Sequence, residues 1–154
     1  YFRSLGFTEE STAAIMGNMY QESGMNPIAL QNGIGPAAGI CQWEKFQDPN
    51  SRWGRLNAYA ESQGKSWMDL QCQLDFLMQE LNGADATTKA IMDRDYGGLE
   101  NFKRSTDINW AVEAFERSFE RAGIPNMQAR YTQANAYYAM YHGREVVTDT
   151  DEED

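Results

Sequence analysis

The sequence predicts one mostly helical domain, with a small irregular or β lobe inserted after the first helix. The chain has 154 residues, which is enough for one sizeable core but short for two. Apolar residues recur at helical spacing along most of it. Between residues 26 and 51, however, three glycines and three prolines interrupt that periodicity, which favours turns or short strands there.

The first predicted helix begins after Thr8 and ends at Gly24. Threonine is a good N-cap, and the acids that follow it, Glu9 and Glu10, are favoured in a first turn by the helix dipole. Glycine is the usual residue just past a helix end, and Pro27 lies shortly beyond it.

Five further helices are expected after the irregular segment, each ended by a glycine or by the next helix start. The weakest pattern among them is that of residues 85–96. The expected ranges are 52–63, 70–82, 85–96, 108–122 and 126–142.

The net charge of −10 argues against nucleic-acid binding, because phosphate recognition needs clustered Lys and Arg. The last six residues, "DTDEED", carry five of the acids, which leaves the remainder at −5. We therefore expect a domain at 1–143 and an acidic linker or disordered tail at 144–154. The opening "YFRSLGF" resembles the middle of a fold, so we expect tethering to further domains. No apolar run is long enough to predict a membrane span.

Cysteine and histidine are too few for several kinds of chemistry. One histidine, His142, cannot supply the imidazoles of a typical catalytic zinc site, and no calcium- or phosphate-binding motif is present. No metal or cofactor is therefore predicted. A cysteine peptidase using Cys41 or Cys72 with His142 is a third class of function, but no activating signature surrounds either cysteine. Hydrolysis would have to depend on carboxylates.

Glu22 is the carboxylate that the pattern singles out. It lies seven residues after Ile15 and three after Met19, so it shares their apolar face of the first helix. It also lies in the last turn, where the helix dipole disfavours negative charge. Burial and dipole would both raise its pKa, as general-acid catalysis requires. The alternative for an isolated helix-end Glu is a capping or solvated residue.

Four segments, in order, resemble the phage tail lysozyme family of the lysozyme-like superfamily. They are "GNMYQESGMNP" with "GPAAGICQW", "DLQCQLDFLMQEL" and "FERAGIPNMQAR". The resemblance covers the chain up to about Gly143. It implies a lysozyme-like α+β fold, in which a helical bundle surrounds a central helix and the lobe forms one wall of a cleft.

The resemblance also implies a reaction and its site. Members of this family cleave the β-1,4 bond between N-acetylmuramic acid and N-acetylglucosamine in peptidoglycan, so Glu22 would protonate the leaving oxygen. Ser23 would orient that carboxyl, while Gln42 and Trp43 would bind sugar amides and ring faces. Core packing is the alternative for Trp43. Tyr20 is a further candidate for a sugar subsite.

A second carboxylate is not fixed by any motif. Alternation along a strand from Gln42 would place Glu44 on the same face, which makes it the first candidate; Asp48 is a weaker one. Without a partner carboxylate, a lytic transglycosylase remains an alternative to a hydrolase. A catalytically dead module that binds glycan or scaffolds a tail is the other alternative.

Late in the chain, Glu120 and Arg121 match family positions, and we expect them to form an ion pair that braces a helix against the cleft floor. Arg130 is also expected to be structural. The tyrosines of the last helix are expected mainly in the core. The predicted setting is extracellular or associated with a virion tail, acting on glycan strands of the bacterial cell wall.

Overall fold

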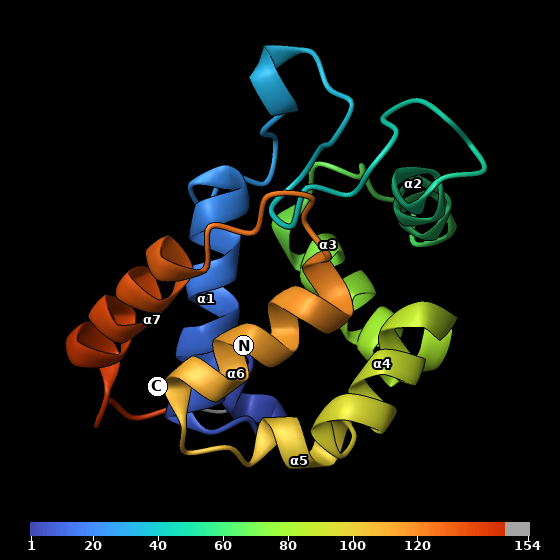
Figure 1. Cartoon of the computed structure of the whole chain (residues 1–154). Coiled ribbons are helices and arrows are strands. Elements are labelled where there is room, and N and C mark those ends of the chain that lie inside the picture. Colours follow the sequence, from blue (N-terminus) through green and yellow to red (C-terminus); the bar gives the residue numbers. More distant parts are fainter. Residues whose placement is uncertain (147–154) are drawn as a thin grey trace, which may run out of the picture.

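The computed structural model describes residues 1–146, and within that range the chain folds into seven α-helices (Figure 1). Two of them continue into a π-helical turn, α3 into η3 and α6 into η4. The α-helices are α1 Glu9–Ser23, α2 Arg52–Ser62, α3 Leu70–Gln79, α4 Ala86–Tyr96, α5 Leu99–Lys103, α6 Ile108–Phe115 and α7 Met127–Tyr141; the shorter turns are η1 Arg3–Leu5, η2 Gln31–Gly33, η3 Glu80–Ala84 and η4 Glu116–Glu120. Most of the predicted acidic tail, residues 147–154, lies outside the described residues.

The bounds of α1, α2, α4 and α7 agree with the predicted ranges to within one residue, while the helices expected at 70–82 and 108–122 end in π-helical turns. Thr8 Oγ1 accepts a hydrogen bond from Ser11 N at the start of α1, and Ser51 does the same for Gly54 N at the start of α2. At the other end of α1, Gly24 has the left-handed φ of 64° and its N–H donates to Tyr20 O. The sequence did not predict α5, whose five residues are too few to show a helical period.

The apolar helix α6 lies in the middle of the bundle, between α1 and α4 (Figure 1). Ala111, Val112, Ala114 and Phe115 on it are fully buried. Helices α1 and α7 pack closely beside each other, and at their contact a Cβ on Gly17 would lie 2.7 Å from Cβ of Ala134. The glycine therefore allows α7 to approach α1, which fixes α7 against the end of α1 that bears Glu22.

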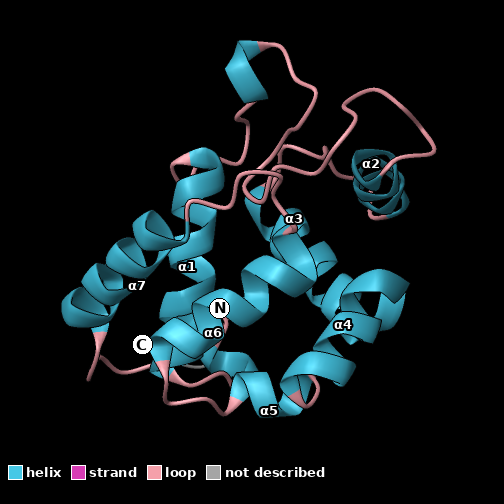
Figure 2. Ribbon diagram, viewed as in Figure 1, coloured by secondary structure: helices cyan, strands magenta, loops and turns pink. Residues whose placement is uncertain are grey.

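The predicted β character of the lobe is wrong. No strand occurs among residues 1–146, and the segment between α1 and α2 is a loop with one short turn (Figure 2). Its only sheet-like contacts there are the isolated bridges from Ala38 to Leu30 and to Trp43. Left-handed φ values at Asn32, Gln42 and Lys45 reverse the chain too often for a strand to extend.

The expectation that the α7 tyrosines form core is also wrong. Tyr131, Tyr137 and Tyr138 are only partly buried, and Tyr141 is exposed. Only Arg130 and Ala134 of α7 are buried, so this helix covers the bundle rather than entering it. Among the described residues, no helix has both the length and the apolar character needed to cross a membrane.

Candidate active site

A cleft of about 410 Å³ lies where the end of α1, the irregular lobe and the segment after η4 meet. Polar side chains supply most of its functional groups, including three carboxyls, three amides and one guanidinium. Its lining residues are Gln21, Glu22, Gln31, Ala37, Gln42, Glu44, Glu120, Ala122, Gly123, Ile124 and Arg130. A smaller apolar-walled groove elsewhere, of about 170 Å³ between α1 and α7, contains none of these residues.

Glu22 occupies the last turn of α1, and its side chain is 16% exposed. Its Oε1 accepts a hydrogen bond of 2.6 Å from Nη2 of Arg130. Burial nevertheless raises the pKa of Glu22 above its ordinary value, against the lowering effect of Arg130, and the charges of Glu116 and Glu44 add to the rise. A carboxyl of this kind stays protonated to higher pH than a free glutamate.

Arg130 comes from the first turns of α7 and is 2% exposed. Its Nη1 donates to Asn18 Oδ1 at 3.0 Å, and its Nε donates to the carbonyl of Pro125. Asn18 is itself fixed, because its amide donates to the carbonyls of Ala14 and Val112. These contacts hold the guanidinium in place against Glu22, a contact that the sequence alone did not indicate.

Glu44 and Gln42 do line the same cleft, although not for the reason of strand alternation. Trp43 exchanges two backbone hydrogen bonds with Ala38, which closes a tight hairpin, and Gln42 in that turn has φ of 57°. The amide of Gln42 donates to the carbonyls of Ala29 and Gly39, so its oxygen is the part available to a ligand. Glu44 is exposed and belongs to the part of the lobe that lines the cleft.

Asp48, the weaker candidate for a second carboxylate, does not line the cleft. Its Oδ1 accepts from the backbone N–H of Asn50, and its carbonyl accepts from Ser51. It therefore shapes the turn that leads into α2.

Three other predicted residues lie near the cleft without lining it. Ser23 donates to the carbonyls of Met19 and Ile40, which ties the end of α1 to the lobe. Trp43 is 1% exposed, and its indole N–H donates to Glu80 at 2.6 Å, so its geometry favours a structural part. Tyr20 is 47% exposed and packs edge-on against Tyr137. Two residues along a helix correspond to about 200° of rotation, so Tyr20 and Glu22 point in nearly opposite directions.

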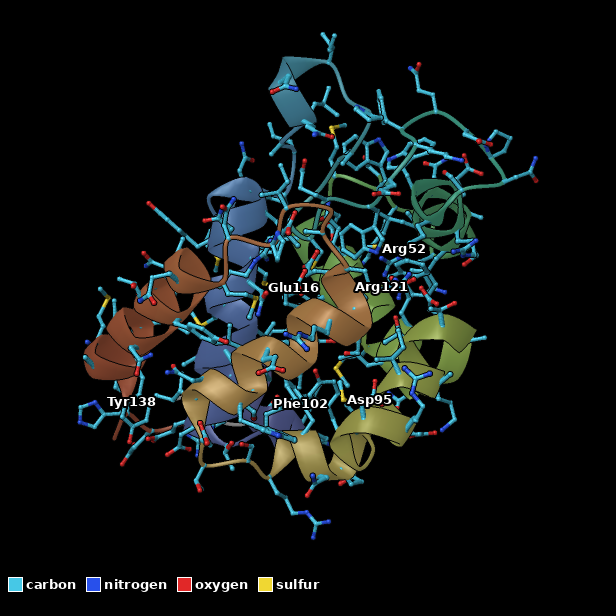
Figure 3. The ribbon with its side chains drawn as sticks, viewed as in Figure 1. Arg52, Asp95, Phe102, Glu116, Arg121 and Tyr138 are labelled. Atoms are coloured by element: carbon cyan, nitrogen blue, oxygen red, sulfur yellow. The ribbon has the colours of Figure 1, made fainter. Side chains whose placement is uncertain are left out.

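The expected ion pair between Glu120 and Arg121 does not form. Arg121 has a left-handed φ of 51° at the end of η4, and its guanidinium turns back to Thr88 and the carbonyl of Ser118. It also lies 3.5 Å from Asp85, which is shared with Arg52; both arginines are labelled in Figure 3. Glu120 instead lines the cleft.

Gln21, Gln31 and Ile124 also line the cleft and were not predicted from the sequence. Gln21 directly precedes Glu22. Ile124 belongs to the "GIP" segment that follows the predicted helix, and its side chain is 80% exposed. An exposed isoleucine is a weak signal, since single apolar residues on surfaces are common. The position of Gln31 at the cleft depends on the path that the lobe takes, and no local sequence pattern predicts that path.

The geometry gives no support to a cysteine peptidase. Both cysteines are buried, and burial raises the pKa of each thiol, most strongly that of Cys41. His142 lies at the far end of α7, where its ring bonds the carbonyl of Tyr138. Neither cysteine lines the groove that contains His142.

A largely buried carboxyl with a raised pKa that shares a polar cleft with an exposed glutamate is an arrangement typical of enzymes that cleave glycosidic bonds. Residues 1–141 match the family model described as phage tail lysozyme, and the chain therefore belongs to that family. Membership of a lysozyme family implies peptidoglycan-degrading activity, with peptidoglycan as the substrate.

A more distant similarity links the chain to Morphogenesis protein 1 of Bacillus phage B103. The two are 27% identical over 148 residues, which cover 94% of this chain. The chain spans only about 38% of the length of that protein.

Proposed function

We propose that this protein is an N-acetylmuramidase, which hydrolyses the β-1,4 bond between N-acetylmuramic acid and N-acetylglucosamine with Glu22 as the general acid. Family membership supports the substrate class. The observation that carries the assignment of Glu22 is its position: a largely buried carboxyl, held by Arg130, at the wall of the polar cleft.

The environment of Glu22 suits the first proton transfer. Burial favours the neutral carboxyl, so a proton is available to the glycosidic oxygen as its bond to carbon breaks. Once that proton has gone, Glu22 is an anion, and the guanidinium 2.6 Å away stabilises it. Arg130 therefore favours the state of Glu22 that forms as the leaving group departs.

Glu44 is our candidate for the second carboxylate. It lines the same cleft as Glu22 and is exposed, so it can contact water. It would stabilise positive charge on the sugar or activate a water molecule. The amides of Gln21, Gln31 and Gln42 would bind the acetamido and hydroxyl groups of the glycan.

The same bond could instead be broken by a lytic transglycosylase, which forms an anhydro-sugar without water. The exposed carboxylate of Glu44 favours hydrolysis, because a water-activating group is then in place. The third alternative is a module that binds glycan or scaffolds a tail without catalysis. The largely buried Glu22–Arg130 pair at an open cleft disfavours it, because binding alone does not require such a pair.

We also propose that the domain acts from a virion tail, as part of a larger protein. The similarity to a phage morphogenesis protein, of which the chain spans about 38%, supports this setting. The chain carries a net charge of −10, so anionic wall polymers would not attract it, and attachment would depend on other parts of the tail.

Clearing of purified cell walls tests the assignment. Glu22→Gln keeps the size of the side chain and a hydrogen-bond acceptor for Arg130 but has no proton to give. We expect it to lower the initial rate of turbidity loss at least about 100-fold. Glu100→Gln on the exposed surface of α5, the matched control, should clear at the wild-type rate. Equal clearing by wild type and Glu22→Gln would exclude Glu22 as the acid.

A further inference from the structure

Glu120 is the carboxyl of the cleft that the mechanism above does not use. It ends the π-helical turn η4, which continues the buried helix α6 to the cleft wall. Its Oε1 is inaccessible to solvent and has no hydrogen-bond partner within residues 1–146. A buried carboxyl oxygen without a partner is costly as an anion, which favours the protonated form.

The cations around Glu120 are already engaged by other groups. Arg130 donates to Glu22, Asn18 and the carbonyl of Pro125. Arg52 donates to the carbonyl of Phe119 and lies 3.2 Å from Asp85 and 3.7 Å from Glu80. Arg121, its neighbour in sequence, turns away to α4 as described above.

Other titratable groups surround Glu120 on several elements. They come from α1, the lobe, α2, η4 and α7, and carboxyls and cations are both represented. The charges of Glu22, Arg52, Glu116 and Arg130 act on Glu120, the charge of Glu120 acts on Cys41, and Glu44 lines the same cleft. Burial raises the pKa of Glu120 well above its ordinary value, and the negative charge of Glu22 raises it further, while Arg52 and Arg130 lower it by less than burial and Glu22 raise it.

We propose that Glu120 and Glu22 together hold one proton across the working pH range, and that Glu120 is a positioning residue that keeps part of the Glu22 population protonated where Glu22 alone would be ionised. The proposal rests on the assignment of Glu22 as general acid. Two interacting carboxyls lose their protons in two steps that belong to the pair. Between those steps the single proton is distributed over both groups, and the molecules that carry it on Glu22 are active.

The pH profile of Glu120→Gln tests this arrangement, because glutamine fills the same space but cannot hold the shared proton. We expect wild-type activity to fall gradually toward high pH, through two ionisations. In Glu120→Gln it should fall tenfold per pH unit through one ionisation, with near-wild-type activity at the acidic end. A purely structural role would leave the shape of the profile unchanged, and that result would overturn the proposal. Glu100→Gln on the exposed surface of α5 is the control, and its profile should have the wild-type shape.

Carbon-13 NMR of the glutamate side-chain carboxyls in the wild type gives a readout that requires no activity. We expect the Glu120 signal to titrate above the range of a free glutamate, with both Glu22 and Glu120 showing two steps. In Glu22→Gln, Glu120 should titrate in one step at lower pH, since the negative charge is gone. An unchanged Glu120 titration would overturn the pairing. A Glu22→Gln protein that still clears walls would instead overturn the proposed function, whatever Glu120 does.

Discussion

Nη2 of Arg130 lies 2.6 Å from Oε1 of Glu22, and the two side chains are 2% and 16% exposed. They come from positions 108 residues apart, on the two helices that pack at Gly17 and Ala134. The tertiary fold therefore creates the environment of Glu22.

Arg130→Gln should destabilise the protein because it leaves a buried carboxylate without its partner. We expect a loss of about 3–5 kcal/mol at pH 7, where Glu22 would otherwise be paired. The pKa of Glu22 is already raised in the folded state, so its ionisation opposes folding as pH rises through that pKa. Losing Arg130 raises it further. The loss should therefore be smaller near pH 4, where Glu22 is protonated with or without Arg130.

Urea unfolding at the two pH values measures this difference. A loss of the same size at pH 4 and pH 7 would show that Arg130 stabilises the fold through Asn18 and Pro125 alone. In the Arg130→Gln protein that does fold, the decrease of activity at high pH should occur at a higher pH than in the wild type. Without the guanidinium, Glu22 keeps its proton to higher pH.

Glu44→Gln should lower kcat at least about 100-fold with little change in KM, if Glu44 stabilises the sugar cation or activates water. It should also move the high-pH fall of activity to lower pH, since the charge of Glu44 raises the pKa of Glu22. Asp48→Asn is the matched control, because Asp48 lies in the same lobe outside the cleft. Full activity in Glu44→Gln would leave Glu22 as the only catalytic carboxylate among the candidates and favour transglycosylation.

Trp43→Phe tests whether this residue binds sugar or supports the core. Phenylalanine retains packing against Phe76 and Phe119 but removes the N–H that donates to buried Glu80. We expect a loss of about 1–3 kcal/mol in the free energy of unfolding, with KM unchanged. A large rise in KM without loss of stability would return Trp43 to the substrate-binding residues.

Gly17→Ala has two opposite effects on stability, a gain in helix propensity and a steric clash between α1 and α7. In an exposed helix the change would stabilise by up to about 1 kcal/mol. Here the new Cβ would lie 2.8 Å from the backbone of Ala134, so α1 and α7 must separate. We expect a net loss of about 1–3 kcal/mol, observed as a lower melting temperature. Gly143→Ala is a control without a steric clash, because a Cβ there would have no atom within 4 Å. Any destabilisation by this change reflects the backbone strain of alanine at a φ of 78°.

Local pattern was enough to predict every α-helix except α5, and the place of Glu22 on α1. Thr8, Gly24 and the apolar spacing of α1 act within a few residues, so the start, end and buried face of that helix follow from sequence. Glu22 was singled out by the same spacing, and it does line the cleft.

The rest of the site depends on contacts between distant segments. Arg130 reaches Glu22 only because α7 packs on α1, and Glu120 reaches the cleft only because a π-helical turn ends α6. The lobe has no strand because residues such as Asn32 and Gln42 adopt left-handed conformations, which their side chains permit but do not require. The ion pair expected between Glu120 and Arg121 from the family resemblance is wrong, because the guanidinium of Arg121 turns to Thr88 and Asp85 instead.

The most direct test of the central claim is mass spectrometry of peptidoglycan digested by the wild type, with Glu22→Gln as the control. We predict soluble fragments that end in reducing N-acetylmuramic acid, and none above background from the variant. Fragments that end in anhydro-muramic acid would show that the enzyme is a lytic transglycosylase and not a hydrolase. Fragments ending in reducing N-acetylglucosamine, or equal yields from the two proteins, would contradict a muramidase that uses Glu22 as its acid.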